Sequence, residues 1–284
     1  MYVNASPFDG LPPLSGPLRQ RAVGRVAFSA AAFDGHTRPA RISESGSMRI
    51  RLPKVTGTGL DAVLVNAAGG IACGDSFQVE IDAGIGTSVT VATPAAEKVY
   101  RSDGPVAALV VSLRVGASAR MDWLPQETLL FDHARLKRRL DVEMEEDARV
   151  TLFEAVVFGR AASAEQVETG YFEDRWRIRR GRRLIYADTL RLDGPIAALL
   201  RKPSVAHGAH VLATLLHVAP DSQARLESVR QHLASNRSCD AAASAWNGLL
   251  AVRFCAASIE ALRAAVCPFL VAFRGEALPR VWLS

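Results

Sequence analysis

Three glutamates of this chain, Glu97, Glu127 and Glu154, are the residues whose spacing suggests shared chemistry. Each follows one of three similar strand-like segments that begin about 30 residues apart, a spacing typical of stacked repeats. If the repeats stack, the carboxylates lie on one edge, where their oxygens and water could hold a cation such as Ni²⁺ in transit. The pattern leaves two hypotheses open, an acidic path through the protein and three unrelated surface side chains.

Glu154 is the least surface-like of the three, because it lies inside the apolar stretch Leu152–Phe158. An unpaired carboxylate in such a setting costs several kcal/mol, so it needs a partner or a function. Arg160 is near it in the sequence, and we expect these two side chains to form an ion pair. Glu154 is also the residue that we expect to contribute most to a transient path for such a cation.

Sites of the common enzyme classes are not predicted. The turn Gly69–Asp75 reads G-G-I-A-C-G-D and lacks the G-K-[ST] of a phosphate-binding P-loop. No G-x-S-x-G nucleophile motif occurs, and Cys73 has no histidine near it in the sequence. His210 and His217 would face opposite sides of a strand, so a histidine metal site is not expected. The sequence predicts a protein that is not an enzyme and holds no tightly bound cofactor.

The composition is that of a soluble globular protein, because 49% of the 284 residues are apolar and 22% are charged. No run of about 18 apolar residues occurs, so no membrane span is expected. Residues 1–20 predict a flexible N-terminal arm without signal-peptide features, and residues 21–284 predict one β-rich domain. The four cysteines form no C-x-x-C pair, which favours reduced thiols and a cytoplasmic location.

The basic residues gather in two clusters, Arg135–Arg139 and Arg175–Arg183, in a chain of formal net charge +5. Such clusters favour an acidic protein or a nucleic acid as partner. Trp176 is the one tryptophan in the second cluster, and no RNA-binding signature occurs. An acidic protein partner is the preferred interpretation, and a basic β-rich nucleic-acid-binding protein is the alternative.

The segments that must position the glutamates are Thr87–Val91, Ala119–Trp123 and Ala148–Leu152, and they alternate with Ala107–Val115 and Leu136–Met144. All five have the period-2 apolar pattern of β-strands. A repeated unit of strand, turn, strand and loop predicts a β-solenoid-like body, but an ordinary antiparallel sandwich would give similar spacing. Periodicity alone does not decide between these two architectures.

The last third of the chain adds a hairpin at Gly170–Arg191 and helical periodicity at Ser222–Ala234 and Ser258–Phe273. Pro268 should bend or end the second helix. Pro279–Trp282 predicts a short extended tail, whose tryptophan could dock a partner or pack in the core. The predicted fold class is mainly β, with stacked antiparallel or solenoid-like sheets and about two helices in the C-terminal third.

The stretch Val63–Ser102 carries the most distinctive pattern, N-x-x-G-G-I-x-x-G-D followed by T-x-A-A-x-K-V-Y-R-S. Its glycines permit positive φ, and its aspartate is suited to accept backbone N–H groups in the turn. With W-L-P-Q-E-T, F-E, G-R and P-R-V-W further on, the chain resembles the UreD (UreH) family of urease accessory proteins over about residues 20–284. The motif residues are Asn66, Gly69, Gly70, Gly74, Asp75, Lys98, Tyr100, Arg101, Gln126, Arg160, Arg280 and Trp282.

The resemblance implies a mainly β scaffold of two stacked sheets that helps to insert nickel into apo-urease. Family members bind apo-urease on one side and the helical partner UreF on the other, and UreF recruits the GTPase UreG, which brings nickel. GTP hydrolysis would belong to UreG, in agreement with the missing P-loop. The expected partners are UreF-like and UreG-like proteins and apo-urease, with a homodimer inside the complex as a further expectation; neither a nucleic acid nor a membrane is expected.

Overall fold

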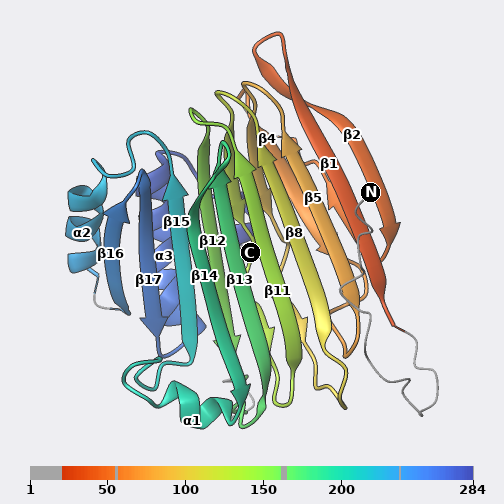
Figure 1. Cartoon of the computed structure of the whole chain (residues 1–284), viewed down its shortest axis with the longest axis vertical. Coiled ribbons are helices and arrows are strands. Elements are labelled where there is room, and N and C mark those ends of the chain that lie inside the picture. The colour runs from red at the N-terminus through yellow and green to blue at the C-terminus, as the bar shows by residue number, and fades with distance from the viewer. Residues whose placement is uncertain (1–20, 55–56, 161–164, 237, 284) are drawn as a thin grey trace.

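The computed structural model describes residues 21–54, 57–160, 165–236 and 238–283. Two β-sheets pack face to face, and helices α2 (Leu226–Ala234) and α3 (Ile259–Arg274) cover the C-terminal strands of the second sheet (Figure 1). The expected N-terminal arm, residues 1–20, lies outside the described residues.

Within the described residues the first sheet has seven strands in the order β14-β13-β11-β8-β5-β1-β2. Its strands are β1 Val23–Phe33, β2 His36–Gly46, β5 Ser76–Ala83, β8 Ala107–Val115, β11 Arg135–Met144, β13 Gly170–Arg180 and β14 Arg183–Gly194. The second sheet runs β16-β17-β15-β12-β9-β6-β4-β3, with β10 paired to both β12 and β7. Its strands are β3 Met48–Arg51, β4 Leu60–Asn66, β6 Ser88–Ala92, β7 Glu97–Val99, β9 Arg120–Leu124, β10 Thr128–Leu130, β12 Arg149–Phe158, β15 Val211–Val218, β16 Asp240–Trp246 and β17 Leu249–Ala256.

The chain alternates between the two sheets through the middle of the molecule. β5, β8 and β11 stack in parallel in the first sheet, so that Val79 lies beside Val111 and Val111 beside Leu140. β6, β9 and β12 stack in the same way in the second sheet, where Thr90 lies beside Asp122. The solenoid-like hypothesis is therefore confirmed, and the antiparallel sandwich is wrong for these strands. Antiparallel pairs flank the parallel stack, at β1–β2, β3–β4 and β13–β14.

The turns that lead from the first sheet to the second repeat one hydrogen bond. The N–H groups of Thr87, Ala119 and Ala148 each donate to the carbonyl oxygen three residues earlier. Successive turns lie so close together that a Cβ on Gly116 would be 2.9 Å from the backbone nitrogen of Ile85. This repeated turn holds the stacked strands in register and requires glycine at its tightest approach.

Two apolar cores share the ten-stranded sheet. The larger one fills the space between the sheets with alternating side chains that include Phe77, Leu113 and Met121. The smaller one lies between the second sheet and α3, where Phe254 and Leu270 are buried. Burial of each large side chain contributes roughly 1.5–3 kcal/mol, so the sheet that faces both cores is the most strongly held part of the fold.

Helix α3 confirms the second predicted helix. At the start of this helix, the Ser258 hydroxyl accepts a hydrogen bond from the Ala261 N–H at 3.2 Å. Of the two outcomes expected at Pro268, a bend or an end of the helix, the end is wrong, because the helix continues to Arg274. Its apolar side packs against the second sheet, and this packing offsets the one hydrogen bond that proline removes. A short helix, α1 (Ile196–Leu200), was not predicted, because five residues are too few for a helical period.

The C-terminal tail is a 3₁₀ turn, Arg280–Trp282, and not the extended segment that the sequence predicts. The Trp282 side chain is buried, and its indole N–H donates to the Leu124 carbonyl at 2.9 Å. Its ring also packs against Phe153 at a centroid distance of 5.7 Å. The tryptophan therefore packs in the core, which was one of the two roles left open by the sequence.

Candidate functional site

A small cavity lies between the two sheets, on the central strands. It measures about 50 Å³. A buried water needs roughly 10–15 Å³ of such space, so the cavity has room for a few waters or a partly hydrated ion. Its polar lining residues are Asn66, Thr93, Glu97, Gln126, Thr128, Arg138 and Glu154, and the other lining residues are apolar. Two of the three predicted glutamates therefore meet at one cavity.

Glu154 is 5% exposed and lies in the interior of β12. Its Oε1 accepts a hydrogen bond from Trp123 Nε1 at 2.8 Å, and its Oε2 lies 2.5 Å from Arg138 Nη1. The expected partner Arg160 is exposed and pairs with Glu165 at 2.5 Å instead. That prediction is wrong because Glu154 points toward the facing sheet, and its cation comes from that sheet and not from its own strand.

Arg138 on β11 is the cation of the cavity, and it is 4% exposed. Its Nε and Nη2 donate to the two carboxylate oxygens of Asp174 at 3.0 and 2.5 Å, and its Nη1 donates to Thr128 at 3.1 Å. Burial alone would lower the pKa of Arg138, but Asp174 and Glu154 raise it above its ordinary value. The guanidinium therefore stays charged, and its bidentate bond to Asp174 balances that charge.

Glu97, the first residue of β7, also lines the cavity. Its Oε1 accepts a hydrogen bond from Asn66 Nδ2 at 3.3 Å, and the same amide group donates to the Gly70 carbonyl at 3.1 Å. Asn66 thus ties the glycine-rich turn to the carboxyl group of Glu97. These contacts give the motif asparagine a physical role at the cavity.

The two carboxyl groups of the cavity hold protons far more readily than exposed glutamates do. Burial raises the pKa of Glu97 to about 7, and the hydrogen bond from Asn66 opposes this rise only partly. Burial also raises the pKa of Glu154 to about 7, with Arg138 acting against the rise and Asp174 adding to it. Near neutral pH both groups are therefore partly protonated.

The cavity combines oxygen ligands with one buried cation. The Arg138 guanidinium is in contact with two carboxylates, Glu154 and Asp174, and Glu97 is the third carboxyl group beside this cavity. The described lining contains carboxylate, amide and hydroxyl oxygens and neither histidine nor cysteine. Nickel is held more firmly by imidazole and thiolate ligands, so oxygen ligands of this kind would let it leave again.

Glu127 does not reach this cavity. Its neighbours Gln126 and Thr128 line the cavity, so Glu127 faces the opposite side of the sheet, as alternation along an extended chain requires. There its carboxylate lies 3.8 Å from Arg263 of α3. The structure thus brings together two members of the predicted acidic path and places the third elsewhere.

The glycine-rich turn is built around Tyr100. The Tyr100 hydroxyl donates to the Gly69 carbonyl at 2.9 Å, and a Cβ on Gly70 would lie 2.5 Å from the tyrosine ring. Gly69 and Gly70 have φ values of 77° and 138°, which glycine adopts readily. Asp75 caps the turn as predicted, since its carboxylate accepts the N–H of Ala72 at 2.7 Å.

The other motif residues fall into two groups. Lys98, Arg101 and Arg280 are exposed, and Gly74 takes a positive φ of 77° in the turn. Gln126 is buried and links the cavity wall to the tail, because its Nε2 donates to the carbonyl of residue 281 at 2.9 Å. The C-terminal motif thus contacts the cavity wall through Gln126.

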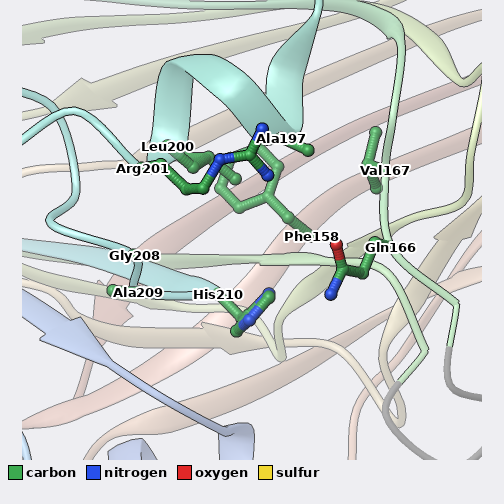
Figure 2. Close-up of a pocket in the computed structure, with 9 residues that line it drawn as sticks. All are labelled: Phe158, Gln166, Val167, Ala197, Leu200, Arg201, Gly208, Ala209 and His210. Atoms are coloured by element: carbon green, nitrogen blue, oxygen red, sulfur yellow. The ribbon is translucent and has the colours of Figure 1, made fainter.

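A second cavity, of about 140 Å³, lies beside α1 (Figure 2). Its polar lining side chains are Gln166, Arg201 and His210, and Figure 2 shows His210 and Gln166 on the side away from the α1 helix. His217, in contrast, is buried within β15 against Thr151 at 3.1 Å, so the two histidines do not meet. This cavity contains neither Glu97 nor Glu154, and it combines no carboxylate with a nucleophile.

The sequence did not indicate Trp123 and Arg138 as residues of the first cavity, or Asp174 as the partner of Arg138. Alternation could have identified two of them. Arg138 stands between the inward-facing Leu136 and Leu140, and Asp174 stands between residues Phe172 and Trp176, which also face inward. A charged residue at an inward position of a strand needs a buried partner.

Among the described residues, no group of three or more histidine, cysteine, aspartate or glutamate side chains is placed to hold a metal ion. No described helix is long and apolar enough to cross a membrane.

The comparisons with known proteins agree across almost the whole chain. The family model described as UreD urease accessory protein matches residues 20–283. A protein named urease accessory protein UreD from Azorhizobium caulinodans is 53% identical over 266 residues, covering 94% of this chain and 98% of that protein. Proteins of the same name from Xanthobacter autotrophicus and a Methylobacterium species are 56% and 51% identical, covering 94% and 95% of this chain and 92% and 98% of their own lengths.

Proposed function

Because the chain belongs to the UreD urease accessory protein family, we propose that it is a non-catalytic scaffold in the assembly of the nickel centre of urease. In this proposal the chain binds apo-urease and helps nickel to reach the active site of that enzyme. The observation that supports the nickel role best is the cavity between the sheets, because both Glu97 and Glu154 line this one small space.

The proposed partners are those that the sequence resemblance implies. A UreF-like protein would bind this scaffold. The UreF-like protein would in turn recruit a UreG-like GTPase, which would supply nickel and hydrolyse GTP. The two-sheet body has a broad outer face on the first sheet and a helix-covered face on the second (Figure 1), so it can present different surfaces to different proteins. The four cysteines are free thiols, which fits the cytoplasmic location that we propose.

Nickel is the cargo of this scaffold and not a resident cofactor. The route that we propose passes the cavity, where ionised Glu97 and Glu154 attract the cation and the nearby Arg138 keeps the attraction moderate. Water and oxygen ligands then exchange quickly, whereas a site of three or four nitrogen or sulfur ligands would retain the metal. Glu127 lies outside the cavity and has no part in this step.

Reconstitution of urease tests the proposal. Apo-urease, the UreF-like and UreG-like proteins, GTP and limiting nickel are incubated with and without this chain, and urease activity and bound nickel are measured. Both should rise only when the chain is present, and the chain alone should release no phosphate from GTP. Equal activation without the chain would contradict the scaffold role. GTP turnover that a point substitution in this chain abolishes would contradict its non-catalytic nature.

A further inference from the structure

The β13–β14 hairpin carries an excess of positive charge that the proposed nickel route does not use. Strands β13 and β14 form one edge of the first sheet (Figure 1). The hairpin contains seven arginines, at positions Arg175, Arg177, Arg179, Arg180, Arg182, Arg183 and Arg191. It contains only four acidic residues, at positions Glu173, Asp174, Asp188 and Asp193.

The four carboxylates of the hairpin are occupied, mostly by cations from other strands. Glu173 lies 3.2 Å from Lys137 of β11, and Asp174 binds the buried Arg138. Asp188 pairs with Arg253 of β17. Asp193 lies 2.9 Å from Arg191, within the hairpin itself. Three of the four carboxylates therefore pair with cations from outside the hairpin. Most arginines of the hairpin have no carboxylate partner within it.

Five of these arginines have no carboxylate within ion-pair distance among the described residues: Arg175, Arg177, Arg179, Arg182 and Arg183. Alternation places the first three on the outer face of the sheet, with consecutive members roughly 7 Å apart. Asp141 and Glu143 of β11 lie opposite Arg177 and Arg179 in register, but Asp141 pairs with Arg139 and Glu143 lies 3.7 Å from Arg114. The outer face at this edge thus carries a row of three guanidinium groups, of which Arg179 is exposed and the other two are half-buried. Arg182 and Arg183, at the turn of the hairpin, are also exposed.

The chemistry of this row fits carboxylates better than nucleic acid. A guanidinium group binds a carboxylate through two parallel hydrogen bonds, and a row of them on a flat sheet fits a row of acidic side chains. Binding of single-stranded nucleic acid needs free aromatic faces, but the Tyr171 ring of this hairpin already lies against Arg135 and Arg191. We propose that the arginine row of the β13–β14 hairpin docks an acidic surface of another protein of the urease activation complex.

The test compares two triple variants with the same change in net charge. Arg175→Gln/Arg179→Gln/Arg183→Gln removes three uncompensated charges, whereas Arg25→Gln/Arg38→Gln/Arg41→Gln removes three arginines at the opposite edge of the first sheet. Arg177 is left in place because its side chain holds two backbone carbonyls. Binding to purified apo-urease, UreF-like protein and UreG-like protein is measured separately by biolayer interferometry at low and at high salt. The unfolding temperatures of both variants serve as the check on folding.

The hairpin variant should bind one of the three partners about tenfold more weakly at low salt, and this difference should shrink at high salt. The control variant should bind that partner like the wild type. Unchanged binding to all three partners would overturn the proposal, even if the chain still activates urease. A labelled single strand of about 20 nucleotides tests the alternative partner. If the wild type binds this strand more tightly than it binds each protein, and the hairpin variant does not bind it, the proposal is overturned in favour of nucleic acid. This inference rests on the proposed function. If the proposed function itself is wrong, the wild type will bind none of the three partners and will not activate urease.

Discussion

Two carboxyl groups that face one small cavity compete for protons and cations in the same pH range. Glu97 and Glu154 both have a pKa raised to about 7 by burial, so each is partly protonated at neutral pH. A divalent cation that enters the cavity would displace these protons. Uptake of nickel into the cavity should therefore weaken as the pH falls below 7, because fewer carboxylates are ionised.

Substitution of Glu97 by glutamine should stabilise the protein at alkaline pH. The pKa of this group rises from its usual value near 4.5 to about 7 on folding. Between these values the folded state holds a proton that the unfolded chain has lost, so wild-type stability falls as the pH rises through this window. Glu97→Gln should match the wild type below pH 4.5 and exceed its free energy of unfolding by about 1–3 kcal/mol above pH 7. Urea unfolding at pH 4 and pH 8 measures this difference, and equal stability at pH 8 would contradict the buried, ionised state.

The sequence identified the two carboxyl groups but not the ion pair that accompanies them. Glu154 could be predicted as buried, because apolar residues flank it on both sides. Its partner Arg138 lies on the opposite sheet, and the pairing of two inward-facing charges depends on how the sheets stack. Alternation alone predicts which face of its strand a residue occupies. It does not predict which residue of the other sheet lies opposite.

At the scale of elements, the glycine-rich turn depends on close packing against Tyr100. A methyl group on Gly70 would lie 2.9 Å from the Lys98 carbonyl oxygen, and the residue has φ 138°. Gly70→Ala should therefore lower the free energy of unfolding by roughly 2–4 kcal/mol, from backbone strain and crowding together. Gly104→Ala is the matched control, since it has φ 147° and nothing within 4 Å of its added Cβ. Thermal unfolding of both variants separates the two effects, and equal losses would show that crowding at Gly70 contributes nothing.

The C-terminal turn should matter for stability before it matters for docking. Trp282 is buried and bonded to Leu124, so Trp282→Ala should cost about 3–5 kcal/mol of unfolding free energy. Arg280→Ala in the same turn is the control, because its side chain is exposed. Urea unfolding measures both. Wild-type stability of Trp282→Ala together with weakened partner binding would contradict the packed tail and support a docking role.

The period-2 pattern correctly predicted strands and the hairpin. Several other elements could not be predicted from it. The alternation in Leu136–Met144 and the hairpin at Gly170–Arg191 correspond closely to β11 and to β13–β14. Helix α1 and strand β16 (Asp240–Trp246) are short, and β16 is largely alanine, so neither has a strong apolar period. Pro268 was misleading because the tertiary packing of α3 outweighs the local preference of proline.

At the scale of the whole molecule, the solenoid-like stack explains why distant motifs meet. Each repeat crosses from the first sheet to the second, so residues about 30 positions apart become neighbours. Thr128 pairs with Glu97 on one side and with Val156 on the other, which brings three motif segments to the cavity wall. The regular spacing predicted this stacking, but the face on which each glutamate lies had to come from the structure, as Glu127 shows.

Nickel delivery by Glu154→Gln tests the central claim most directly. Glutamine keeps the size of the side chain and can still accept one hydrogen bond, while the Arg138–Asp174 pair remains balanced. Glu127→Gln is the control, because it removes an equal charge outside the cavity. Apo-urease is activated with each variant at limiting nickel, after unfolding temperatures and complex formation are shown to match the wild type. We predict that nickel bound per urease active site falls several-fold with Glu154→Gln and stays at the wild-type level with Glu127→Gln; full nickel loading with Glu154→Gln would contradict the route through the cavity.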